Sequence, residues 1–215
     1  MKPPVKLNLG CGPSGLDDWL NFDHGALPLL SKMPVARRWL VKIGVLPAGY
    51  DVRWPPIRLV DIRKRFPLSS DSVQFIYCSH VLEHLERWEA LHVLRECHRV
   101  LAAGGCVRIV VPDLRLICTT YLAGEGERPA QDACRTLWGH PKDIAPRGFV
   151  GRLARRFIRP HEWGYDHAEM ELLMREAGFA DVRRCEFRQG ATPDLDGVEL
   201  EGHQPYSLYV EAFKS

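Results

Sequence analysis

The chain has 215 residues, a length that suits one domain with a full hydrophobic core. Its 29 Lys and Arg residues nearly balance its 27 Asp and Glu residues, which gives a formal charge of +2. A dedicated nucleic-acid-binding protein usually has a strong basic excess, so we expect no nucleic-acid partner.

The chain carries no sequence sign of export or of a membrane span. No apolar stretch approaches the roughly 18 residues that cross a bilayer. The first four residues lead directly into a strand pattern, which leaves no room for a signal peptide. The seven cysteines are scattered and include no Cys-x-x-Cys pair, which favours free thiols over disulfides or a zinc site. We therefore expect a cytoplasmic location.

Short apolar runs bounded by turn residues predict strands. They cover residues 5–9, a run ending near Asp23, and residues 57–61, 73–79, 106–111, 182–187 and 207–213. Apolar residues at helical spacing predict helices over residues 85–101 and 168–177. Strands that are apolar throughout and alternate with helices indicate a parallel sheet covered on both faces. The last two strands have no helix pattern between them, which favours antiparallel pairing at the end of the chain.

Two longer segments, about 25–56 and 114–167, interrupt this alternation. The first contains a basic amphipathic helical piece over residues 35–45, and the second contains the basic run Arg147 to Arg159. Such helices can lie on an anionic membrane or bind phosphate groups, but they can equally be solvated helix faces. Peripheral contact with the inner face of the membrane through the basic segment is left open.

In an open α/β sheet, ligands bind beyond the carboxyl ends of the strands. The residues at the first four strand ends are Gly10, Cys11 and Gly12, then Asp23, then Asp61, then Ser79 and His80. Glycines let the backbone approach a ligand closely because no Cβ intervenes. A carboxylate such as Asp23 can accept ribose hydroxyl protons, and Asp61 could accept the exocyclic amine of adenine. Together the four ends suit an adenosyl ligand.

Several motifs carry a family resemblance. They are Val5 to Pro13 around the glycine loop, Phe66 to Ile76 before and in the next apolar strand, Ser79 to His84, Leu94 to Leu101, Gly104 to Asp113, Ala177 to Phe179, and Leu208 to Ala212. These segments resemble class I S-adenosylmethionine-dependent methyltransferases of the type 11-like group. They are similar to bacterial predicted methyltransferases linked to surface polysaccharide biosynthesis.

The resemblance implies an α/β fold: a Rossmann-like three-layer sandwich with a mostly parallel seven-stranded sheet and an antiparallel final strand. It implies a single methyltransferase domain over residues 1–215, with the two segments as insertions, and S-adenosylmethionine as the cofactor. Carried over residue by residue, it implies four contact regions. Gly10, Cys11 and Gly12 would face the amino-acid part of the cofactor, Asp23 the ribose, Asp61 and Ile62 the adenine, and Ser79 and His80 the sulfonium centre.

Two features depart from the usual pattern: the spacing from Gly12 to Asp23, and Gln74 in place of the family's usual Asp after the turn, which we interpret as structural. Gly12 and Asp23 are 11 residues apart, against roughly 20 in dinucleotide sites, so the first helix must be very short or lost. Asp17 or Asp18 could then compete with Asp23 for the ribose.

The predicted reaction is methyl transfer to a small-molecule or glycan acceptor, with oxygen as the acceptor atom. His80 is our candidate general base, because its unperturbed pKa of about 6.5 suits proton transfer. His161 is the second candidate catalytic residue, and packing roles remain open for both. His161 and His167 are six residues apart with no Cys at ligand spacing, so we expect no metal.

Two alternatives remain from the sequence. One is a nicotinamide-dependent Rossmann oxidoreductase, although the third glycine of that fingerprint is missing. The other is a non-catalytic module that binds an adenosyl ligand.

Overall fold

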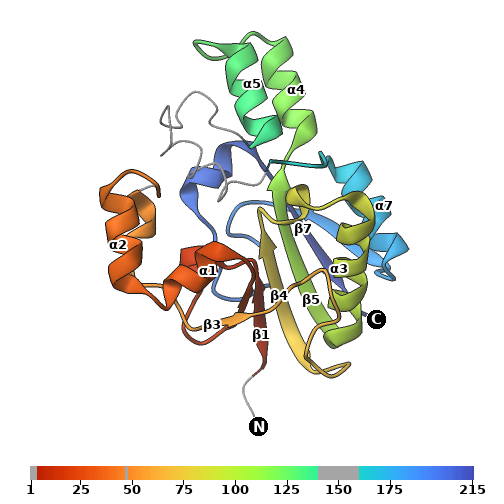
Figure 1. Cartoon of the computed structure of the whole chain (residues 1–215). Coiled ribbons are helices and arrows are strands. Elements are labelled where there is room, and N and C mark those ends of the chain that lie inside the picture. Colours follow the sequence, from red (N-terminus) through yellow and green to blue (C-terminus); the bar gives the residue numbers. More distant parts are fainter. Residues whose placement is uncertain (1–3, 47, 140–159) are drawn as a thin grey trace.

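The computed structural model describes residues 4–46, 48–139 and 160–215 (Figure 1). The predicted basic run Arg147 to Arg159 lies outside these residues. Within the described ranges no helix is long and apolar enough to cross a membrane.

Seven strands form one sheet (Figure 1). They are β1 (Lys6–Leu9), β2 (Leu20–Asp23), β3 (Ile57–Leu59), β4 (Val73–Ser79), β5 (Leu101–Pro112), β6 (Asp181–Cys185) and β7 (Ser207–Phe213). Their order is β3-β2-β1-β4-β5-β7-β6. The first five strands in this order, β3, β2, β1, β4 and β5, run parallel to one another. The strand β7 runs antiparallel to its two neighbours, β5 and β6. The predicted fold class, with an antiparallel final strand, is confirmed.

Most predicted helices are present with small shifts in their bounds. The helices are α1 (Ala26–Ser31), α2 (Pro34–Lys42), α3 (Arg87–Val100), α4 (Leu114–Leu122), α5 (Pro129–Trp138), α7 (His167–Glu176) and α8 (Leu195–Val198). Short 3-10 turns are η1 (Gly12–Ser14), η2 (Ala48–Tyr50), η3 (Leu82–His84) and η4 (Glu201–Tyr206). The prediction of no helix between the last two strands was wrong, because α8 and η4 lie there.

The first helix of the fold is reduced, as the short spacing predicted. Between β1 and β2 the chain makes the three-residue turn η1 and then a bend that returns it to β2. So few residues cannot cross the sheet face as a full helix. This face must therefore be covered by another part of the chain.

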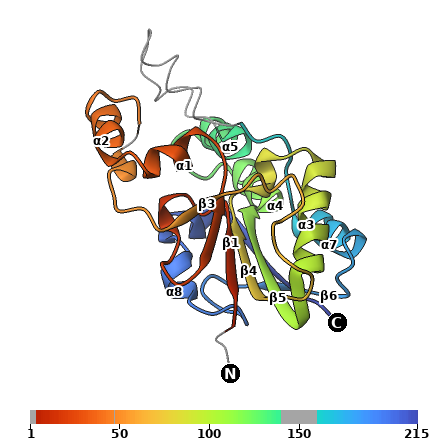
Figure 2. The ribbon, with the colours of Figure 1, turned by 60° about the horizontal axis from the view of Figure 1, so that its bottom comes forward.

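The core consists of two clusters, because side chains of a strand alternate between the faces of the sheet. On β4, Ile76 and Cys78 belong to the larger cluster, and Tyr77 between them belongs to the smaller one. The larger cluster packs under α3 and α7, which lie together on one side of the sheet (Figure 2). The smaller cluster packs under α8, which replaces the missing first helix on the other side (Figure 2).

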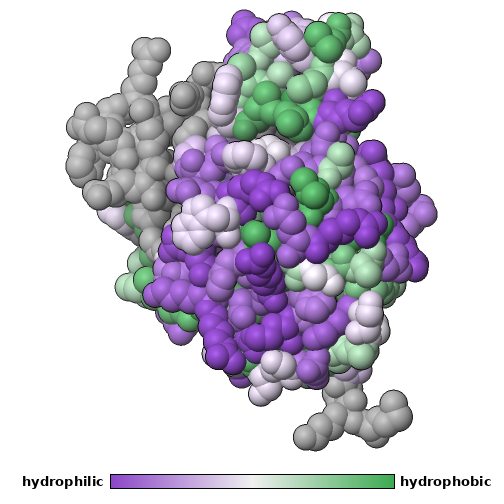
Figure 3. Space-filling model, turned by 90° about the vertical axis from the view of Figure 1, so that its right-hand side faces the viewer, coloured by the Kyte–Doolittle hydropathy of each residue, from purple (hydrophilic) through white to green (hydrophobic). Residues whose placement is uncertain are grey.

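The helices α4 and α5 project from the sheet as a pair (Figure 1). Seen from the side, the surface is largely hydrophilic, and apolar side chains gather on this projection at the top (Figure 3). Leu122 is 81% exposed there, and Tyr121 and Trp138 are also exposed. The helix α4 begins directly after β5, so this pair stands over the same edge of the sheet as the other strand ends.

Candidate active site

The structure brings the predicted strand ends together around one cavity of about 330 Å³, within the range of about 300–1,000 Å³ for small-molecule sites. The predicted residues that line it are Gly10, Gly12, Asp23, Asp61, Ile62 and His80. We call this cavity the donor cavity. Its position at the carboxyl ends of β1 to β4 follows from the parallel order of these strands.

The glycine loop is shaped by the backbone and by Asp23. Gly10 has φ +65° and Gly12 has φ +50°, conformations that residues with a Cβ rarely adopt. A Cβ on Gly10 would also overlap the side chain of Val81. The Gly12 N–H donates a hydrogen bond of 2.9 Å to Asp23 Oδ2, so the loop after β1 is fastened to the end of β2.

The carboxylate of Asp23 also accepts the His24 N–H at 2.7 Å. An ionised carboxylate only accepts hydrogen bonds, the role that ribose hydroxyl donors require. Asp17 pairs with Arg53 and Asp18 pairs with Lys6, and neither lines the donor cavity. Among the three acidic residues, the structure therefore places Asp23 at the cavity.

Asp61 is fixed by its neighbour Arg63. The guanidinium donates to both carboxylate oxygens at 2.9 and 3.0 Å. These hydrogen bonds lower the pKa of Asp61 to about 2. Asp61 therefore presents a charged acceptor at the wall of the cavity, beside the buried side chain of Ile62.

Two predicted cofactor contacts do not line the cavity. Cys11 is buried in the turn, where burial and the nearby Asp23 carboxylate raise the pKa of its thiol to about 12. Ser79 ends β4 beside His80 but is not among the lining residues. Cys11 is thus placed to support the loop shape, and its thiol is not presented to the cavity.

The first inserted segment contributes a wall that the sequence did not reveal. Leu27, Pro28, Tyr50 and Trp54 line the donor cavity. Tyr50 and Trp54 contact each other at 5.9 Å between ring centroids, and Trp54 is buried. The only sequence signal for this wall was the presence of aromatic residues in a proline-rich insertion. These residues have no fixed spacing from the strand ends, so their position at the cavity could not be predicted.

His80 is held between two polar groups. Its Nδ1 lies 3.0 Å from Glu83 Oε1, and its Nε2 lies 3.0 Å from Ser207 Oγ. His80 has φ +53°, an uncommon conformation for a residue with a Cβ, and such residues cluster at functional sites. The arrangement carboxylate, imidazole, hydroxyl can pass a proton from a hydroxyl to the ring.

Burial alone would raise the pKa of Glu83, but the imidazoles of His80 and His84 reverse this effect and lower the pKa. Glu83 therefore remains ionised next to Nδ1 of His80. The ring of His203 also contacts the ring of His80, with 4.0 Å between the centroids and the planes tilted by 52°. Burial and the neighbouring His80 lower the pKa of His203 to about 4, so His203 is neutral near pH 7.

A second cavity of about 320 Å³ opens next to the first. Its lining residues are His80, Pro112, Arg135, Thr136, Gly139, His161 and Tyr206. We call it the acceptor cavity. His80 lines both cavities, and His161, the second predicted catalytic residue, lies in the acceptor cavity and contacts the ring of His84 at 4.8 Å.

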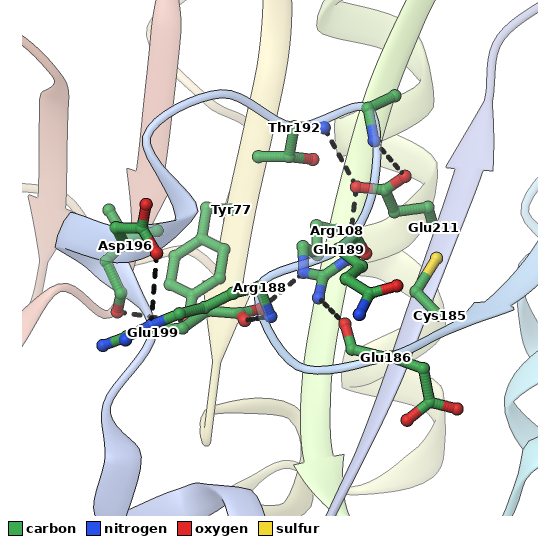
Figure 4. Close-up of polar contacts among 12 residues, drawn as sticks. Tyr77, Arg108, Cys185, Glu186, Arg188, Gln189, Thr192, Asp196, Glu199 and Glu211 are labelled. Carbon is green, nitrogen blue, oxygen red and sulfur yellow. Dashed lines mark hydrogen bonds and ion pairs between the residues drawn. The ribbon is translucent and has the colours of Figure 1, made fainter.

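The turn η4, which carries His203 and Tyr206 to this site, follows a loop anchored by a buried ion-pair network (Figure 4). Arg108 on β5 donates to Glu199 at 2.5 Å and to Glu211 on β7 at 3.3 Å. It also donates to the backbone carbonyls of Gln189 and Glu186 at 2.9 and 2.8 Å. The guanidinium thus ties the loop to the sheet on the face that lacks the first helix.

Comparisons with known proteins agree with this architecture. Residues 7–109 match the sequence model of the family described as "Methyltransferase domain". A methyltransferase structure from Methanosarcina mazei described as S-adenosylmethionine-dependent matches with a TM-score of 0.54, 14% identity, and coverage of 100% of this chain and 93% of that chain. One from Thermotoga maritima, described likewise, matches with a TM-score of 0.52, 13% identity, and coverage of 100% and 84%.

Among curated proteins, an uncharacterized protein of Saccharomyces cerevisiae is 35% identical over 74 residues, which are 34% of this chain and 8% of that protein. The chain also spans about half the length of other solved structures that it resembles. The family match over residues 7–109 and the shared fold confirm the predicted resemblance to class I methyltransferases. They also support S-adenosylmethionine as its cofactor.

Proposed function

We propose that this protein is an S-adenosylmethionine-dependent methyltransferase that methylates an oxygen atom of a small molecule or glycan. The observation that carries the proposal is the position of His80, which lines both the donor cavity and the acceptor cavity. A group shared by two adjoining cavities can act where the two reactants meet.

The donor cavity fits an adenosyl ligand by its chemistry. Gly10 lets the backbone approach the amino-acid part, Asp23 accepts ribose hydroxyls, and Asp61 and Ile62 bind the adenine edge and face. S-adenosylmethionine supplies a methyl group on a positively charged sulfur. The protein's part is to align the acceptor oxygen with that methyl group and exclude water, and alignment alone can supply about 7–11 kcal/mol of the barrier.

The acceptor cavity favours a hydroxylated molecule. Tyr206 and His161 offer ring faces and hydrogen bonds, and Arg135 adds a positive charge at the wall. In the proposed reaction an acceptor hydroxyl takes the position of Ser207 Oγ at His80 Nε2. His80 accepts the hydroxyl proton, and Glu83 holds the other ring nitrogen and stabilises the imidazolium.

The cofactor is tested by calorimetric titration with S-adenosylmethionine, S-adenosylhomocysteine and NAD. We expect binding of the two adenosyl-sulfur ligands and none of NAD. Tight binding of NAD alone would support the oxidoreductase alternative. Binding of the methyl donor without turnover on any acceptor would support the non-catalytic module.

The acceptor is tested with a methyl-labelled donor and a panel of nucleotide-linked and lipid-linked sugars, followed by NMR of the product. We expect the label on an oxygen, and a product methylated on nitrogen or carbon would contradict the proposal. His80→Ala is expected to lower kcat more than it raises the Kd of the donor. Equal losses would make His80 a binding residue.

We also propose peripheral contact with an anionic membrane, through α2. Val35 and Trp39, four residues apart on one face of this helix, are 81% and 60% exposed, and Arg38 is exposed beside them. Co-sedimentation with phosphatidylglycerol vesicles tests the contact. We expect binding that Trp39→Ser weakens, and equal binding by both proteins would remove α2 from this role.

A further inference from the structure

Three metal-ligating side chains meet between the donor and acceptor cavities. Glu83, His84 and His161 each place a possible ligand atom within 4.8 Å of the other two. His84 lines the donor cavity and His161 lines the acceptor cavity. The group therefore lies at the junction of the two, outside the contacts assigned above to the methyl donor.

The backbone holds this group together. Glu83 and His84 are neighbours on η3, and His161 comes from a segment remote in sequence. The N–H groups of Glu162 and Trp163 donate to the Glu83 carbonyl at 2.7 and 3.2 Å. Because these two hydrogen bonds join backbone atoms, they place His161 near His84 independently of the side-chain conformations.

Both imidazoles are oriented by carbonyl oxygens. His84 Nδ1 lies 3.0 Å from the Pro160 carbonyl oxygen, and His161 Nδ1 lies 3.2 Å from the Leu137 carbonyl oxygen. A carbonyl oxygen only accepts, so each Nδ1 carries the proton and each neutral ring keeps its Nε2 lone pair for a ligand. Metal-binding histidines are usually held in this way by a second hydrogen bond.

Glu83 is a buried carboxylate with few hydrogen-bond donors for its charge. Its side chain is 1% exposed, and His80 Nδ1 lies 3.0 Å from its Oε1. Beyond His80 and the N–H of Glu83 itself, neither carboxylate oxygen accepts a hydrogen bond from the described residues. A buried carboxylate so poorly solvated is costly. A cation bound between this carboxylate and the two imidazoles would compensate its charge.

We propose that Glu83, His84 and His161 bind a divalent transition-metal ion, for which zinc is the best match. Two imidazoles and one carboxylate form the protein ligand set of an open zinc site, with a fourth position free. Ligand atoms around a tetrahedral zinc ion lie about 3.4 Å apart, so small side-chain rotations close the group around the ion. The free position is available to an oxygen of the acceptor, a use that rests on the proposed function, whereas ion binding does not.

From the sequence we expect no metal, because His161 and His167 are six residues apart with no Cys at ligand spacing. The distant partner, His84, is supplied by the fold. His167 instead lies 3.9 Å from Glu171 on α7, which makes it a matched control.

The test is calorimetric titration of the purified, chelator-treated protein with zinc chloride, without methyl donor or acceptor. The two exposed thiols, Cys118 and Cys134, are replaced by serine in every protein so that they cannot bind zinc. We expect one zinc ion to bind per chain. His84→Ala or His161→Ala should raise the Kd for zinc at least about 100-fold, because even the loss of a residue that only hydrogen-bonds a metal ligand typically lowers metal affinity about 10–100-fold. His167→Ala should bind as the parent does.

Thermal unfolding with and without zinc distinguishes the loss of zinc binding from poor folding of a variant. Zinc should raise the Tm of the parent and of His167→Ala but not of His161→Ala or Glu83→Gln. Cobalt(II) in place of zinc should give visible bands of a four-coordinate site, which His84→Ala abolishes. No zinc binding by the parent, or equal binding by His84→Ala and His167→Ala, would overturn the metal site. Donor titration of the same samples reports on the proposed function separately.

Discussion

We expect the replacement Arg108→Met to destabilise the protein strongly, because it removes the positive charge from a closed, buried network. The side chains of Arg108 and Glu199 are fully buried, and that of Glu211 is 3% exposed. Methionine fills similar space but leaves two carboxylates without their cation. Removing one partner of a buried ion pair typically costs about 3–5 kcal/mol.

The two carboxylates keep some compensation. Glu199 accepts the Arg188 N–H at 2.5 Å, and Glu211 accepts the N–H groups of Ala191 and Thr192 at 2.8 and 3.0 Å. Because these donors remain, we expect the free energy of unfolding to fall by about 3 kcal/mol, the value for breaking a single buried ion pair. For a domain of this size that corresponds to a fall in Tm of roughly 6–12 °C.

Urea denaturation followed by circular dichroism measures the loss, with thermal unfolding beside it. The control is Arg183→Met on β6, because the ion pair of Arg183 with Asp181 is about half exposed and its removal should leave the midpoint unchanged. Adding Glu199→Gln and Glu211→Gln to Arg108→Met should restore most of the lost stability. A fall in Tm below about 2 °C, or no restoration, would refute the reasoning.

Three further predictions concern the glycine loop after β1 and the end of β2. Asp23→Ala should weaken S-adenosylmethionine binding by at least about 1 kcal/mol in calorimetry, and a Kd equal to that of the parent would remove Asp23 from the ribose role. Gly10→Ala should abolish donor binding, because φ +65° and the overlap with Val81 force the loop to move; retained affinity would show that the loop is not in contact with the ligand. Since its raised pKa of about 12 keeps Cys11 a neutral thiol at pH 8, iodoacetamide should alkylate Cys11 at least about 100-fold more slowly than exposed Cys118 in mass spectrometry. Comparable rates would contradict the burial of Cys11.

The sequence alone determined the strands, their order of appearance and the ligand edge. Apolar runs such as Val73–Ser79 and Ser207–Phe213 are strands with the predicted bounds. The spacing of 11 positions from Gly12 to Asp23 predicted that the first helix is very short or lost. Such features are local, because hydrophobic periodicity and chain length act on neighbouring residues, and parallel strands place their ends at one edge.

The tertiary structure decided which distant side chains complete the site. The aromatic wall from Tyr50 and Trp54, the contact of His80 with Ser207, and the meeting of His84 with His161 each join segments with no fixed spacing in sequence. The buried partners of Arg108 are likewise set by the loop that replaces the first helix. These contacts depend on how inserted segments fold back over the sheet edge, and that path is fixed by packing and buried hydrogen bonds between remote residues.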